Sequence, residues 1–365
     1  MKLLFVIGDI SASGGTERVT TEIAATLAEA GHEVSILSLF GPAEPWFDMP
    51  EAVRVKSAGL EPAGGSLRRA AAISRCLKNE SRESGAQAMV LVDSILFAFC
   101  VPWVWKSPIK TVCWEHFNLT TSHGTRMRDL ARLAASRLSA RVVVLTERDA
   151  IAWRKKYRIS NRVQAIWNPI PRFPEAETIG LQQEGGPKIA LAVGRLTTQK
   201  GFDVLLRAWQ HLGDAQNGWV LRIVGGGEEK SALKALATEL GIDESVVFVG
   251  QVRDMASEYR AASLYVMSSR WEGLPMTLLE AQHFGLPSVS TDCPTGPREV
   301  LSGGSGRLVH PEDPQALAEG LAALMMNPDE RTEMARAAQE NAERYRPEGI
   351  RREWEAILNE LMISI

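Results

Sequence analysis

Residues 268–281 have the sequence SSRWEGLPMTLLEA and follow the apolar run Leu264–Met267. The run predicts a short buried strand. Pro275 predicts that a helix begins near it, because proline has no N–H group to leave unpaired in a first helical turn. Gly273 lets the backbone of the connecting turn come close to a ligand. A strand, a tight turn and a helix in this order form the repeating unit of an α/β fold with a parallel sheet.

This stretch carries two carboxylates. Glu272 falls in the turn, and Glu280 falls on the helix that follows. The backbone N–H groups of Leu274, Met276 and Thr277 are expected at the helix N-terminus, where the helix dipole favours an anion such as phosphate. The two carboxylates can accept hydrogen bonds from hydroxyls on either side of a phosphate site. This arrangement suits a sugar nucleotide, which has hydroxyls at both ends and a diphosphate between them.

Short apolar runs alternate with helical patterns over most of the 365 residues, which predicts βα units and parallel sheets. The predicted strands of the first half are Lys2–Ile7, Val34–Leu39, Met89–Val92, Lys110–Cys113, Val142–Leu145 and Val163–Ile166. Those of the second half are Ile189–Val193, Val220–Val224, Val246–Val249, Leu264–Met267 and Ser288–Ser290. Two such sets in a chain of this length indicate two domains, each with its own core.

A proline-rich segment without hydrophobic periodicity separates the two sets of strands. We therefore predict an N-terminal domain over residues 1–170, a linker over 171–187 and a C-terminal domain over 188–346. Residues 347–365 are predicted to be helical.

Glycines, cations and a histidine follow predicted strands. Gly14 and Gly15 open a helix after the first strand, where the backbone could approach a ligand, although such turns are equally common in plain packing. Arg195 and Lys200 follow a strand of the second half, where two cations can hold a diphosphate or remain solvated. A lone histidine at a strand end, as His116 is, is more often structural than catalytic.

Together these motifs resemble those of the retaining glycosyltransferases of family 4, also called glycosyl transferases group 1. The Glu-x7-Glu pattern of Glu272 and Glu280 carries the resemblance. Its companions appear in the order GGTER (14–18), Asn168-Pro169, VGRLTTQKG (193–201), VGGGEE (224–229) and FVGQV (248–252). The resemblance implies an α/β fold of two Rossmann-like, doubly wound domains that face each other across a cleft, the arrangement called GT-B. It also implies that residues 347–365 pack back on the N-terminal domain.

The same resemblance implies a retaining hexosyltransferase. It would move a hexose or N-acetylhexosamine from a nucleotide sugar, expected to be a UDP-sugar, to a glycan or lipid-linked glycan. Residues 292–299 are similar to members that build bacterial surface polysaccharides such as lipopolysaccharide or capsule. The donor is expected on the C-terminal domain and the acceptor on the N-terminal one. Three alternatives stay open, namely a nucleotide-sugar 2-epimerase, a non-catalytic sugar-nucleotide sensor and a transferase with a soluble acceptor.

Residue roles follow from the resemblance. Glu272 and His116 are expected to contact the transferred sugar as catalytic residues, and Glu280 to accept hydrogen bonds from both ribose hydroxyls. Arg195 and Lys200 are expected on the phosphates. The other residues expected to bind the donor are Gly15, Val252, Gly273, Leu274, Pro275, Met276 and Thr277, with Gly14 on the acceptor side.

No metal or other cofactor is expected. The sequence has no Asp-x-Asp motif, and cations with helix N-terminal amides would stabilise the leaving diphosphate in place of a metal.

The basic residues are unevenly distributed. Residues 1–170 hold 22 Lys and Arg against 16 Asp and Glu, and the remainder holds 19 against 28. At about 100° per residue, Arg126, Arg137 and Arg141 share one face of a predicted helix. That face is either solvated or makes a peripheral contact with an anionic membrane near a lipid-linked acceptor.

Other features exclude some classes of protein. A slightly acidic chain with 7% aromatic residues and no basic stretch interleaved with aromatics argues against nucleic-acid binding. Four scattered cysteines predict reduced thiols in a cytoplasmic protein.

The apolar segment 86–105 is long enough to cross a bilayer, but Asp93 near its middle favours a buried strand, a turn and a short helix. No targeting segment is evident, so we expect a cytoplasmic location, or a peripheral one at the inner face of the membrane.

Overall fold

The computed structural model describes residues 1–61, 66–120, 126–173 and 188–363. Their contacts divide the chain into two compact units. The first consists of Met1–Pro171 and Arg346–Ile365, and the second of Arg172–Tyr345. The C-terminal segment therefore belongs to the first unit. Most of the predicted linker, 171–187, lies outside the described residues.

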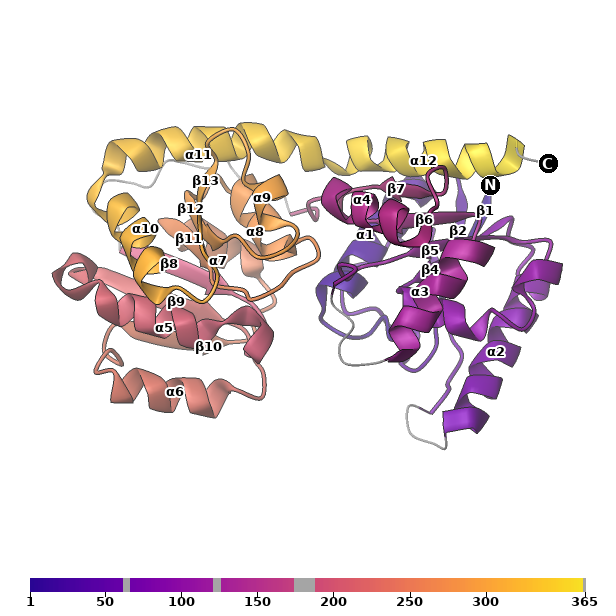
Figure 1. The fold of residues 1–365 in the computed structure, drawn as a ribbon, viewed down its shortest axis with the longest axis horizontal. Helices are drawn as coiled ribbons and strands as arrows, with labels where there is room; N and C mark the ends of the chain where they lie inside the picture. Colours follow the sequence, from indigo (N-terminus) through magenta and orange to yellow (C-terminus); the bar gives the residue numbers. More distant parts are fainter. Residues whose placement is uncertain (62–65, 121–125, 174–187, 364–365) are drawn as a thin grey trace. The chain divides into compact units, whose positions relative to one another are not determined.

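The described strands of the first unit form one parallel sheet in the order β3-β2-β1-β4-β5-β6-β7 (Figure 1). They are β1 (Lys2–Ile7), β2 (Glu33–Ser38), β3 (Arg54–Ser57), β4 (Ala88–Val92), β5 (Lys110–Trp114), β6 (Arg141–Val144) and β7 (Val163–Ala165). The central strands β1 and β4 are buried almost throughout, as is typical of parallel strands covered by helices on both faces. The sequence pattern does not predict β3, because this edge strand is largely exposed and has the polar sequence RVKS.

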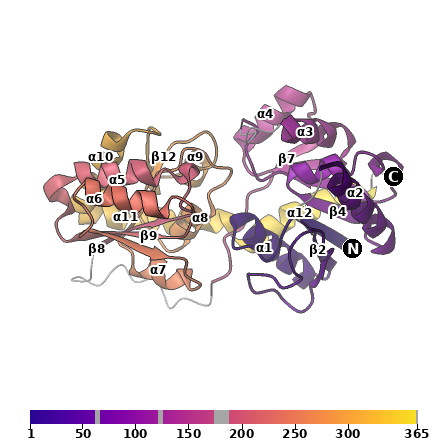
Figure 2. The ribbon, with the colours of Figure 1, turned by 90° about the horizontal axis from the view of Figure 1, so that it is seen from below.

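Helices α1 (Gly15–Glu29), α2 (Ser66–Glu83), α3 (Arg126–Leu138), α4 (Glu147–Tyr157) and α12 (Pro347–Ile363) surround this sheet. α12 packs beside α1, as Figure 2 shows. Its residues Trp354, Ile357 and Leu361 are buried. The Trp354 ring lies 4.8 Å from the ring of Trp114 and 6.4 Å from that of Phe5, measured between centroids. The C-terminal helix thus completes the core of the first unit.

The described strands of the second unit form a second parallel sheet, in the order β10-β9-β8-β11-β12-β13. They are β8 (Lys188–Val193), β9 (Trp219–Val224), β10 (Val246–Gly250), β11 (Leu264–Met267), β12 (Ser288–Thr291) and β13 (Gly306–Val309). The edge strand β13 is only half-buried and is not predicted from the sequence. Two parallel sheets flanked by helices confirm the predicted α/β fold class.

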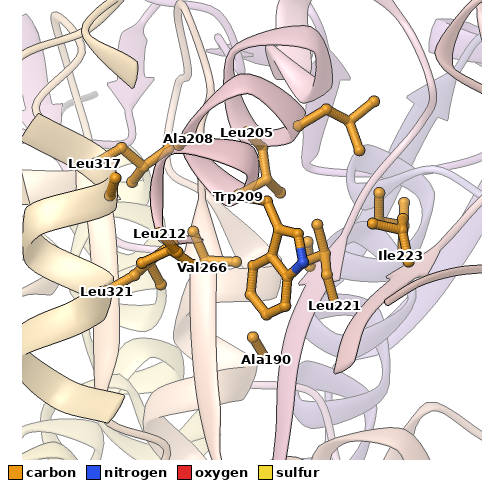
Figure 3. Close-up of a cluster of buried hydrophobic side chains, with 14 of the residues drawn as sticks. Ala190, Leu205, Ala208, Trp209, Leu212, Leu221, Ile223, Val266, Leu317 and Leu321 are labelled. Carbon is orange, nitrogen blue, oxygen red and sulfur yellow. The ribbon is translucent and has the colours of Figure 1, made fainter. Parts of the chain in front are cut away.

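The helices of the second unit are α5 (Phe202–His211), α6 (Lys230–Glu239), α7 (Met255–Ala261), α8 (Met276–His283), α9 (Pro297–Val300), α10 (Pro314–Met326) and α11 (Pro328–Ala342). Figure 2 shows α7 on the opposite side of the sheet from α5, α6 and α10. A core cluster of the unit lies between the sheet and α5, α6 and α10. Trp209 is at its centre, among side chains that include Leu205, Leu221 and Leu321 (Figure 3).

The apolar segment 86–105 folds as the predicted buried strand, turn and short helix. β4 is followed by Asp93, the short 3-10 helix η1 (Ser94–Phe99) and a second one, η2 (Val104–Lys106). Across the described residues, no helix is both long and apolar enough to cross a bilayer.

Trp209 gives a direct test of the core of the second unit. Its side chain is fully buried, and its Nε1 donates to Ser245 Oγ at 3.0 Å. We expect Trp209→Ala to lower the free energy of unfolding by about 3–5 kcal/mol, because it leaves a large cavity. Urea denaturation followed by far-ultraviolet circular dichroism measures the change. Met326→Ala is the control, because Met326 is 70% exposed on the neighbouring α10 and should change stability by less than about 0.5 kcal/mol. Equal losses in both variants would contradict this description of the core.

Candidate functional site

The candidate donor site lies where β8 and β11, which are neighbours in the sheet, end. The strand order runs outward in both directions from this pair, so their carboxyl ends mark the switch point at which open α/β sheets bind ligands. Lys200 ends the 3-10 helix η3 (Thr198–Lys200), which follows β8, and Glu272 lies in the turn after β11. The fold therefore brings together two predicted site residues that are 72 positions apart.

Lys200 and Glu272 form an ion pair. Lys200 Nζ donates to Glu272 Oε1 at 2.7 Å, and Ser269 Oγ donates to the same oxygen at 2.7 Å. The two charged side chains are only 15% and 7% exposed. Charges this poorly hydrated are stable when they are paired and hydrogen-bonded. An ammonium has three N–H donors, so Lys200 can contact a second anion, such as a phosphate, while it holds this carboxylate.

Close backbone contacts hold the two loops together. Gly201 has φ +60°, and a Cβ on it would lie 2.2 Å from the carbonyl oxygen of Ser268, so only glycine fits. Ser268 Oγ donates to the carbonyl of Lys200 at 2.9 Å. The N–H of Arg270 donates to the carbonyl of Gln199 at 2.8 Å. The position of Lys200 relative to Glu272 is therefore set by backbone geometry.

The turn at Glu272 is also held from the other side. Thr295 Oγ1 donates to the carbonyl of Glu272 at 2.6 Å. Gly296 has φ +94°, and a Cβ on it would lie 2.6 Å from the carbonyl oxygen of Gly273 and 2.5 Å from Pro275 Cδ. The segment 292–299 therefore supports the turn directly.

Helix α8 begins after Pro275, its N-cap residue, so the N–H groups of Met276 and Thr277 belong to its first turn. Leu274 and Met276 are buried, and Thr277 is half-buried. Glu280, one turn further along, is 2% exposed. Two tyrosines reach this helix, as Tyr259 Oη donates to Glu280 Oε2 and Tyr265 Oη to Thr277 Oγ1, each at 2.7 Å. Neither tyrosine is predicted from the sequence, because both contacts are tertiary.

The remaining predicted donor residues of this unit lie further out. Arg195 follows β8 directly and is exposed, so its side chain is accessible to a phosphate. Val252 follows β10 and is half-buried. β10 is two strands from β8 in the sheet, so Val252 lies at the same carboxyl edge but away from the ion pair.

His116, Gly14 and Gly15 belong to the first unit. Gly14 is the N-cap residue of α1, and Gly15 begins this helix, which follows β1. His116 follows β5, and its ring lies 4.5 Å from that of Trp114. Burial lowers the pKa of His116 to about 4, so its imidazole is neutral at pH 7. Its Nε2 is buried and has no hydrogen-bond partner among the described residues. A neutral imidazole suits a hydroxyl partner better than a phosphate.

A buried ionic network next to His116 is missing from the sequence-based prediction. Glu115 Oε2 accepts from Arg132 Nε at 2.7 Å and from Ser94 Oγ at 2.5 Å. Arg128 makes a bidentate pair with Asp93, at 2.7 and 3.0 Å. The available signal was Asp93, a charged residue inside an apolar run, which also argues against a membrane span.

Arg132 also shapes the loop that follows His116. Its guanidinium donates to the carbonyls of Phe117, Asn118 and Leu119 at 3.0–3.3 Å. Glu115 Oε1 accepts from the N–H of Phe117 at 3.1 Å. Burial raises the pKa of Glu115, whereas the two neighbouring arginines oppose that rise.

The prediction of one basic helix face is partly wrong. Arg126 and Arg137 lie exposed on α3, but Arg141 lies in β6, where it pairs with Glu360 of α12 at 2.9 Å. The helix ends at Leu138, and the N–H of Ala140 already donates to the carbonyl of Thr111 at the edge of β5. The chain thus joins the sheet before a third arginine can align with the other two.

Within the ranges that the structure describes, no group of three or more His, Cys, Asp or Glu side chains could hold a metal ion. Cys100, Cys113 and Cys293 are buried thiols, and Cys76 is half-buried.

Known proteins resemble both units. Residues 13–172 match the family model Glycosyltransferase Family 4, and residues 176–341 match Glycosyl transferases group 1. An uncharacterized glycosyltransferase of Haemophilus influenzae is 32% identical over 359 residues, which cover 98% of this chain and 99% of that protein. The amylovoran biosynthesis glycosyltransferase AmsD of Erwinia amylovora is 30% identical over 360 residues, with 98% and 99% coverage.

Two further proteins extend the comparison. A Campylobacter jejuni N-acetylgalactosaminyltransferase, whose name gives a glycan on PP-undecaprenol as its substrate, is 26% identical over 370 residues and 99% of each chain. The fold matches that of HepE from Anabaena, solved with UDP and glucose, at a TM-score of 0.78, with 18% identity over 99% of this chain and 100% of HepE. The two full-length relatives at 30% identity or more place the chain in the glycosyl transferases group 1 family, so that the protein is a glycosyltransferase with the GT-B fold.

Proposed function

We propose that the protein is a retaining transferase that moves a hexose or N-acetylhexosamine from a UDP-sugar to a lipid-linked glycan during surface polysaccharide biosynthesis. The Lys200–Glu272 pair at the switch point of the second sheet is the observation that carries the donor assignment. The name of AmsD supports a role in polysaccharide biosynthesis, and the name of the Campylobacter jejuni relative supports a lipid-linked acceptor.

The donor diphosphate would lie between Lys200, Arg195 and the first turn of α8. Two cations and a helix N-terminus complement a group that carries two negative charges and gains charge as it leaves. Glu280 would accept from the ribose hydroxyls. Glu272, held by Lys200 and Ser269, would accept from hydroxyls of the transferred sugar. His116 would contribute a neutral imidazole to the same sugar.

Donor binding should depend on these side chains. Lys200→Ala, Arg195→Ala and Glu280→Ala should each weaken UDP binding by about 1.5–3 kcal/mol, or roughly 10- to 150-fold. Lys200→Ala should have the largest effect, because it also removes the cation that balances the Glu272 carboxylate beside the diphosphate. Calorimetric titration with UDP measures the loss.

Matched controls are available in the same unit. Lys234 on α6 and Arg207 on α5 are exposed, so Lys234→Ala and Arg207→Ala remove the same charges away from the site and should bind UDP like the wild type. Unchanged affinity in all three site variants would refute the donor assignment.

Turnover should not require a metal ion. We propose that Lys200, Arg195 and the amides of α8 take the place that a divalent cation has in other transferases. Transfer in excess EDTA should therefore equal transfer in added magnesium. Activity abolished by EDTA and restored by magnesium or manganese would show that the diphosphate needs a metal.

The exposed face of α3 suggests how the enzyme reaches a lipid-linked acceptor. Arg126, Leu130, Leu133 and Arg137 fall within about 60° of one another around the helix. Leu130 is 62% and Leu133 43% exposed, so the face combines cations with apolar side chains that water hydrates poorly. Such a surface suits the interface of an anionic bilayer. We propose that this face makes a peripheral contact with the inner leaflet.

Liposome co-sedimentation tests that contact. Arg126→Glu/Arg137→Glu should weaken binding to anionic vesicles by at least about 2 kcal/mol, or roughly 30-fold, because each basic residue near the surface contributes about 1 kcal/mol. Arg75→Glu/Arg82→Glu makes the same change of net charge at exposed positions of α2 and is the control. If both double variants bind alike, or if lipid charge has no influence, α3 is a solvated face and a soluble acceptor becomes the better assignment.

A further inference from the structure

The carboxylate of Glu280 is held by a tyrosine from another helix. Tyr259 of α7 is fully buried, and its Oη donates to Glu280 Oε2 at 2.7 Å. The carbonyl of Thr277 lies 3.4 Å from the same Oη. A hydroxyl has one hydrogen to donate, and a carboxylate at 2.7 Å is a much stronger acceptor than a carbonyl at 3.4 Å. Glu280 is therefore the main partner of this hydroxyl.

The ring of Tyr259 is fixed in place by its neighbours. It stacks on Phe284, with centroids 5.3 Å apart and an angle of 14° between the planes. Phe173 contacts it edge-on, at 6.4 Å. Contacts on two sides leave the hydroxyl little freedom, so the hydrogen bond constrains the rotation of the Glu280 carboxylate.

We propose that Tyr259 is a positioning residue that orients Glu280 toward the two ribose hydroxyls and thereby makes the site select ribonucleotides over 2′-deoxyribonucleotides. The proposal rests on the donor site assigned above. Two neighbouring hydroxyls need a carboxylate whose oxygens point to both of them at once. A carboxylate free to rotate would meet that geometry only part of the time, at a cost in entropy when the nucleotide binds.

Removal of the hydroxyl alone should leave the helix in place. α7 is anchored separately by Arg222, whose Nη2 donates to Glu258 Oε1 at 2.9 Å, with a second bond from its Nε to the same carboxylate. Tyr259→Phe keeps the stacking on Phe284. A change in this variant therefore reports on the hydroxyl and not on the packing of α7.

The experiment compares UDP with 2′-deoxy-UDP by calorimetric titration. The wild type should bind UDP at least about 10-fold more tightly, as expected for a hydrogen bond to a charged group. In Tyr259→Phe this ratio should fall about fivefold, mainly through weaker binding of UDP. Tyr345→Phe is the control, because it removes a buried hydroxyl that donates to the carbonyl of Glu299 at 2.9 Å, and it should keep the wild-type ratio. In a Glu280→Gln background, Tyr259→Phe should cause no further change in the ratio.

The outcomes separate this proposal from the donor assignment. A wild-type ratio in Tyr259→Phe, or equal weakening of both nucleotides, would overturn the role of Tyr259 and leave the donor site intact. A further fall of the ratio in the Glu280→Gln background would also overturn it, because the hydroxyl would then act elsewhere. A wild type that binds both nucleotides equally would overturn the ribose role of Glu280 itself, and the role of Tyr259 with it.

Discussion

The ion pair of Lys200 and Glu272 organises the second unit's site. Both side chains are poorly exposed, so each needs the other's charge, and the loops that carry them are kept in register by Gly201 and Ser268. A replacement at either end leaves a poorly hydrated charge beside the position proposed for the phosphates. The pair therefore stabilises these two loops in the protein without a bound nucleotide. In the proposed donor site the pair also preorganises the cation, which would cost less than ordering a free lysine on binding.

In the first unit, a second set of buried charges holds the loop after β5 in place. Glu115 and Arg132 are both inaccessible to solvent, and Arg132 uses its remaining donors on three successive carbonyls of the loop after β5. That loop begins directly after His116. A guanidinium has five N–H donors in a rigid plane, which is why arginine can bind a carboxylate and several carbonyls together. Hydrogen bonds from a buried arginine thus hold the loop next to the neutral imidazole.

The fold was largely predictable from the sequence because central parallel strands are continuous apolar runs, and such runs are visible without a structure. The edge strands β3 and β13 were missed because one or both of their faces meet solvent and their sequences are mixed. The site was partly predictable for a similar reason. Glu272 and Glu280 are close in sequence, so local spacing indicates them. Tyr259 acts on Glu280 through a tertiary contact that no local pattern encodes.

Helix α3 shows where pattern reasoning fails for a physical reason. Leucines usually face the core and arginines the solvent, yet here Arg128 and Arg132 are buried and Leu130 and Leu133 are exposed. The inversion follows from Asp93 and Glu115, two carboxylates that follow the neighbouring strands β4 and β5. Leaving these carboxylates without a cation would cost more free energy than exposing two leucines. Once those arginines turn inward, the helical period forces the leucines outward beside Arg126 and Arg137. The charge requirement of the buried network thus creates the mixed apolar and basic surface of α3.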